Sequence, residues 1–180
     1  MRYAIPFTVV SLAIVSCIGG APTDPAGISG ASRSSQNAPQ STVAVPLSGR
    51  CDAVMAQPIF VSPGVIRQID SGTCELAHLG KTAFFSNKLI NITTATQTTQ
   101  LSLTAANGDS LYAVGSGTNV PAGPGLIAFV TTLTFEGGTG RFKNAAGEAT
   151  VEGQANLIAR TSTLTVAGSI SYDAADRRDP

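Results

Sequence analysis

The sequence predicts an all-β protein, and more specifically an antiparallel barrel of about eight strands. Apolar and polar residues alternate with a period of two, and no segment keeps the 3.6-residue period of a helix. Short turn signals separate the alternating segments, which is typical of sheets built from hairpins. An antiparallel β-sandwich satisfies the same pattern and is the alternative fold.

The alternation is clearest in the last two predicted strands, Glu148–Leu157 and Thr163–Tyr172, which a turn around Ala159–Thr161 joins. Each has small or apolar residues on one face and mostly polar or small residues on the other. One polar face is typical of a half-buried antiparallel strand. The residues expected to face inward are Ala149, Val151, Gly153, Ala155, Leu157, Leu164, Val166, Gly168, Ile170 and Tyr172. Four of them are very small (Ala149, Gly153, Ala155 and Gly168), which favours a tightly curved sheet and hence a barrel.

A third strand is predicted at Phe129–Phe135. Asn107-Gly108 separates two further alternating runs, which predicts a hairpin with a type I′ turn because both residues tolerate positive φ. The runs on either side of it are 101–105 and 111–113, and the earlier strand candidates are 64–71, 73–79 and 82–94.

The N-terminus has the pattern of an export signal, with Arg2 before an apolar stretch that is too short to span a bilayer of ~30 Å. The signal ends in Ile14-Val15-Ser16-Cys17, which resembles the lipobox of bacterial lipoproteins. That resemblance implies a signal peptide over 1–16 and a lipid on Cys17, which anchors the chain to a membrane of the cell envelope. Ile18 stands where inner-membrane lipoproteins often carry Asp, which favours the outer membrane. An ordinary signal cut near Gly20 or Ala21 is the alternative.

The composition divides the rest of the chain. Residues 17–44 are rich in Gly, Ser, Ala and Pro and are expected to form a disordered tether. The predicted barrel covers 45–172, and 173–180 form a polar tail. Net charge is zero and only 12% of residues are charged, with no basic run, so no electrostatic footprint for nucleic acid exists.

Cys51 and Cys74 are the cysteines left beside Cys17. In an exported protein such a pair predicts a disulfide, worth roughly 3 kcal/mol for a loop of this length. Free thiols, or a metal site that also uses His78, remain as alternatives, although no metal-ligand spacing such as Cys-x-x-Cys supports the latter. The sequence therefore predicts neither a metal nor a cofactor.

The segment Gly137-Gly138-Thr139-Gly140-Arg141-Phe142 is distinctive. Three glycines permit positive φ and a sharp corner, with Phe142 capping one end of the barrel and Arg141 outside. A phosphate-binding loop is the other interpretation, but neither Lys-Ser/Thr nor a helix follows.

This corner carries a family resemblance, together with His78-Leu79-Gly80, Asn107-Gly108-Asp109 and Gly168–Tyr172. Over about residues 45–172 the chain resembles exported bacterial proteins related to the allene oxide cyclase and dirigent superfamily of eight-stranded barrels. Members of that superfamily guide reactive substrates in an apolar cavity with few polar groups.

No catalytic constellation is apparent, since His78 is the single histidine and no Gly-x-Ser-x-Gly elbow occurs. Glu75 and His78 are the weak candidates for ligand-facing groups. We therefore expect a non-catalytic envelope module that binds a small apolar ligand or an envelope partner. The alternatives are a cyclase- or dirigent-like enzyme and a purely structural envelope protein. The oligomeric state is not predicted.

Overall fold

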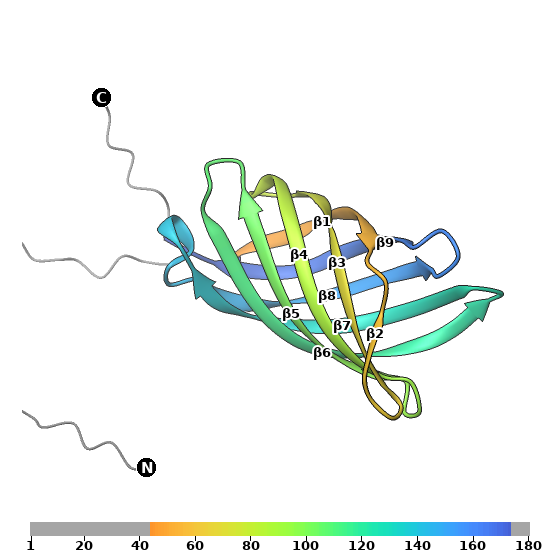
Figure 1. Cartoon of the computed structure of the whole chain (residues 1–180). Coiled ribbons are helices and arrows are strands. Elements are labelled where there is room, and N and C mark those ends of the chain that lie inside the picture. The colour runs from red at the N-terminus through yellow and green to blue at the C-terminus, as the bar shows by residue number, and fades with distance from the viewer. Residues whose placement is uncertain (1–43, 174–180) are drawn as a thin grey trace, which may run out of the picture. The chain divides into compact units, whose positions relative to one another are not determined.

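The computed structural model describes residues 44–173, which form one antiparallel sheet of nine strands (Figure 1). Lipidation of Cys17, the signal peptide and the tether fall on residues 1–43, and most of the polar tail on 174–180, outside the described residues. The strands are β1 (Ala44–Met55), β2 (Ile59–Ser62), β3 (Val65–Leu76), β4 (Gly80–Asn91), β5 (Thr96–Ala105), β6 (Ser110–Gly123), β7 (Leu126–Gly138), β8 (Ala146–Asn156) and β9 (Thr161–Ser171). A 3₁₀ turn, η1 (Gly140–Phe142), lies between β7 and β8.

The sheet closes on itself through β1. That strand pairs with β9 on one side and with β3 on the other, while every strand from β3 to β9 pairs with the next along the chain. The predicted antiparallel barrel of eight strands is therefore confirmed, with β2 as an extra short strand on β3. Closure leaves no second sheet, so the sandwich alternative is wrong.

Two strand assignments differ from the sequence-based expectation. The segments 64–71 and 73–79 were expected as two strands, but they meet in one continuous strand, β3, which passes through Gly72 without a turn and ends at Leu76, before the turn at 77–79. The first strand, β1, was not predicted, although it buries Leu47, Cys51, Ala53 and Met55 on one face. Small and polar residues between these positions weaken its apolar alternation. The predicted number of eight strands was right because dividing β3 in two added one strand and missing β1 removed one.

The Asn107-Gly108 hairpin lies where it was predicted, but its turn is not type I′. Gly108 has a φ of 88°, whereas Asn107 is not among the residues with positive φ. The backbone N–H of Gly108 donates to the carbonyl of Ala105, and the N–H of Ala105 donates to the carbonyl of Asp109. The loop is therefore longer than two residues, and only Gly108 needs the left-handed conformation.

The barrel interior is mostly filled by side chains. Phe84, Phe129, Leu133 and Phe135 are all buried, and they leave an inner cavity of about 50 Å³. A Cβ on Gly153 would lie 2.6 Å from Cζ of Phe129, so this glycine makes room for the phenyl ring.

Two residues expected to face inward are exposed instead. Leu157 follows the end of β8 and lies in a turn, where the strand alternation no longer holds. Gly168 has no side chain to bury, and a Cβ there would meet the backbone of Ala149.

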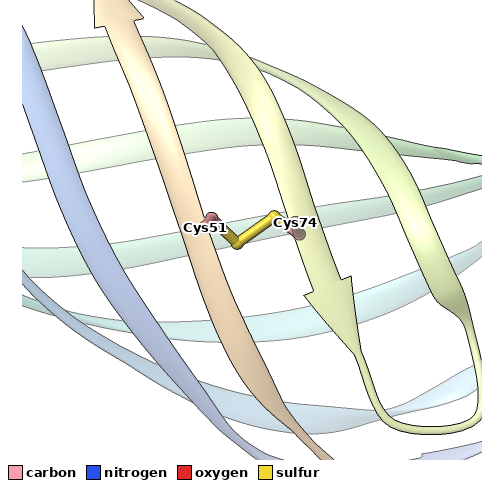
Figure 2. Close-up of a disulfide and its surroundings, with 2 residues drawn as sticks. All are labelled: Cys51 and Cys74. Atoms are coloured by element: carbon pink, nitrogen blue, oxygen red, sulfur yellow. A yellow bond between two sulfur atoms is a disulfide. The ribbon is translucent and has the colours of Figure 1, made fainter.

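Cys51 and Cys74 form the predicted disulfide, which excludes the free-thiol and metal alternatives (Figure 2). The two residues are directly opposite each other on β1 and β3, and both are buried. The disulfide therefore joins the two strands that close the barrel. Among the described residues, no helix is long and apolar enough to cross a membrane.

Candidate binding pocket

The two ends of the barrel carry different connections between strands. We call the end with the β3–β4, β5–β6 and β7–β8 connections the closed end. The other end, which we call the mouth, carries β2 and the turns that join β4 to β5, β6 to β7 and β8 to β9 (Figure 1).

The glycine corner builds the closed end. Gly137 and Gly140 have positive φ, of 84° and 52°, and a Cβ on Gly138 would overlap the carbonyl oxygen of Ser110. The Thr139 hydroxyl accepts a hydrogen bond from the Ser110 N–H, and the Asp109 carboxylate accepts one from the Arg141 N–H. The corner and the Asn107-Gly108-Asp109 hairpin are therefore one hydrogen-bonded unit.

Phe142 is fully buried in this unit, and its ring packs edge-to-face on Tyr172 with ring centroids 5.4 Å apart. The Arg141 guanidinium lies 4.6 Å from the Phe142 ring centroid and is half-buried, so Arg141 does not point freely outward as expected. Aromatic and cation–π contacts of this kind stabilise folded chains without any ligand. These contacts favour the structural interpretation of the corner over the phosphate-binding one.

A pocket of about 410 Å³ lies at the mouth. Its walls are mainly apolar and come from both ends of the chain, with a few polar groups among them. This size and this mixture are typical of small-molecule sites. The apolar lining residues are Met55, Ala56, Pro58, Ile66, Ile90, Ile92, Ala95, Pro121, Ile127, Phe129, Ala155 and Leu157.

A buried ion pair lies among the residues that line the pocket. Lys88 Nζ donates to Asp70 Oδ2, and the Asp70 side chain is only 3% exposed. Gln68 Nε2 donates to the other carboxylate oxygen at 3.1 Å, and Lys88 Nζ lies 5.0 Å from the Phe129 ring centroid. Lys88 and Phe129 also line the inner cavity, so they separate it from the pocket. Because the two charges offset each other, this part of the pocket is close to neutral.

Two polar atoms in the pocket lining have no partner within the described residues. Asn119 Nδ2 and Ser162 Oγ are buried, and neither forms a hydrogen bond with the described chain. Leaving such a group unpaired costs about 1–3 kcal/mol. By contrast, Gln97 Nε2 donates to Thr131 Oγ1 at 2.6 Å. Asn119 and Ser162 are thus available to a ligand that brings its own polar atom.

Neither Glu75 nor His78 faces this pocket. Glu75 is exposed on β3 between the buried residues Cys74 and Leu76, and His78 is exposed in the β3–β4 turn at the closed end with a φ of 66°. Sequence reasoning missed the polar residues of the pocket, although a signal was present. On β3, Gln68 and Asp70 are in phase with Cys74 and Leu76, so polar residues occupy inward positions. Polar residues also occupy inward positions on β5, where Gln97 and Thr99 are in phase with Leu101 and Leu103.

The fold is an eight-stranded antiparallel barrel whose sheet closes on itself, and its pocket lies at the mouth. No protein-family model matches the sequence, and no curated protein matches it. The solved structure of a pterocarpan synthase dirigent protein is similar to this chain, with a TM-score of 0.52 and 12% sequence identity. The match covers 75% of this chain and 93% of that one. At this identity the likeness shows the fold, which is a dirigent-like barrel.

Proposed function

We propose that this chain is a lipid-anchored module of the cell envelope that binds a small, uncharged and mainly apolar molecule at the mouth of its barrel. The mouth pocket of about 410 Å³ is the observation that carries the proposal. The anchor is the lipid on Cys17 that the lipobox resemblance implies, with the outer membrane favoured.

The chemistry of the lining supports an apolar skeleton that bears an oxygen acceptor. Apolar ligand surface that the aliphatic walls remove from water stabilises binding by about 25 cal/mol per Å². The Asn119 amide donates hydrogen bonds, and Lys88 has further N–H groups beyond the one directed at Asp70. Beside the buried Asp70–Lys88 pair, which is already compensated, a charged ligand group would be buried without a partner, which is costly. Arg160, the other charged residue of the lining, is exposed and so lies at the solvent side of the pocket.

Two adjacent residues on β4 provide a matched test. Ile90 lines the pocket, whereas Leu89 points outward and is 44% exposed. Nile red, a neutral and apolar fluorescent dye, serves as the probe. Ile90→Asp places a carboxylate in the apolar wall and should weaken dye binding by about tenfold or more, which is ~1.4 kcal/mol. Leu89→Asp should leave the affinity unchanged.

Thermal unfolding of both variants checks that each one folds. Equal affinities for the two folded variants would mean that the dye binds elsewhere, and the pocket would then not be the binding site.

A further inference from the structure

Large apolar side chains are concentrated at the mouth. Six of them, which we call the apolar rim, are 49–81% exposed, and they belong to β2, to the end of β6 or to the turns after β4 and β8. The rim consists of Ile59, Phe60, Ile92, Val120, Leu157 and Ile158. The turns of the closed end, by contrast, contain no exposed large apolar residue within the described chain.

The charge within the turns that carry the rim is positive. Within the described residues, Arg160 is the only charged residue in the mouth turns, and Arg67, paired with Ile59, is the nearest exposed charge on β3. Asp70 is buried and paired with Lys88, and the exposed acids Asp52 and Glu152 lie on the outer walls of β1 and β8 rather than in the mouth turns. Apolar side chains flanked by cations are the pattern of surfaces that sit in the interface of an anionic bilayer.

We infer that the apolar rim docks onto an anionic lipid surface. Apolar side chains would enter the boundary between headgroups and acyl chains, while Arg67 and Arg160 contact lipid phosphates. Ile92 and Leu157 also line the pocket, so docking places the pocket opening against the hydrocarbon, from which an apolar molecule could enter without crossing water.

The length of chain before β1 is compatible with this orientation. Ala44 begins β1 at the closed end, and 26 residues separate it from Cys17 (positions 18 to 43). They can span at most roughly 90 Å. A strand of 12 residues such as β1 is only about 40 Å long. The mouth can therefore reach the membrane in which a lipid on Cys17 would insert. The docking surface itself does not depend on ligand binding.

Tryptophan fluorescence can locate the docked face because the chain contains no tryptophan. Phe60→Trp places a single indole on the rim, and Tyr112→Trp places one on the outer wall of β6, towards the closed end. The full chain, as the producing cell makes it, is combined with vesicles of phosphatidylethanolamine and phosphatidylglycerol, with and without brominated acyl chains.

The Phe60→Trp emission should shift to shorter wavelength and be quenched by the brominated chains, and the Tyr112→Trp emission should not change. Adding Ile158→Asp to the Phe60→Trp chain should reduce the quenching. An anchor alone leaves both indoles in water, so equal or absent quenching at the two positions would overturn the inference. A blue shift that needs no vesicles and grows with protein concentration would also overturn it, since a second copy would then cover the rim.

Discussion

Asn119 combines burial with an unused hydrogen-bond donor. Its side-chain nitrogen lies in the pocket lining and has no acceptor in the described chain. A site that binds a ligand through such a group is less stable without the ligand than an apolar site of the same shape. Asn87 Oδ1 is also buried without a hydrogen-bond partner in the described chain, but Asn87 lies on the outer wall of the barrel.

This pair gives a prediction at the scale of single residues. Asn119→Leu and Asn87→Leu should each leave the thermal midpoint unchanged or raise it, because each removes an unpaired buried polar atom. Only Asn119→Leu should weaken the binding of Nile red, whose carbonyl oxygen accepts hydrogen bonds, by about two- to tenfold. Fluorescence titration and thermal unfolding measure the two effects. A fall in stability without a change in affinity would give Asn119 a purely structural role.

The elements show what the sequence could and could not predict. Strands β8 and β9 were predicted because their small and apolar residues alternate with polar ones, and the corner at Gly137–Gly140 was predicted from its glycines. The pocket was not predicted, because it exists only when β1 pairs with both β3 and β9 and so brings Met55 close to Ser162. Such long-range closure has no local signature, and β1 itself was not predicted.

The glycine corner gives a prediction at the scale of elements. A Cβ on Gly138 meets the backbone oxygen of Ser110, which cannot move without disturbing β6, whereas on Gly140 it meets the Asp109 side chain. Gly138→Ala should therefore destabilise the barrel more than Gly140→Ala, whose positive φ costs about 1 kcal/mol. Phe142→Ala should cost roughly 3–5 kcal/mol, since that ring is fully buried. Arg141→Ala should lose only about 0.5–1 kcal/mol of cation–π contact.

Denaturant unfolding of these four variants measures how much unfolding free energy each one loses and so ranks them. A larger effect for Arg141→Ala than for Phe142→Ala, or an unmoved midpoint for Phe142→Ala, would contradict the assignment of this segment as a structural cap.

At the scale of the whole molecule, the residues of the family resemblance and the residues of the proposed function lie at opposite ends of the barrel. The residues that carry the family resemblance, among them Asp109, Phe142 and Tyr172, build the closed end. The mouth holds the pocket and the apolar rim. The distinctive sequence motif therefore explains how the closed end is built, whereas the proposed function depends on residues that no motif marks.

The proposed anchor is tested on the intact chain. Cells supplied with an alkyne-bearing fatty acid should incorporate it into this protein, and Cys17→Ser should abolish the incorporation. Cys17 is the only cysteine outside the Cys51–Cys74 disulfide, so no other thiol offers a thioether site. Equal label in both proteins, or none in either, would show that Cys17 does not carry the lipid.

Native mass spectrometry of the chain purified from its own envelope tests the central claim most directly, because it weighs the protein together with whatever fills the pocket at the mouth. We predict a stoichiometric mass increment of a small molecule that is lost on denaturation, is extractable into organic solvent, and is retained by Leu89→Asp but not by Ile90→Asp. A chain that carries the mass of its polypeptide and its lipid alone, or an increment that Ile90→Asp retains unchanged, would contradict the account.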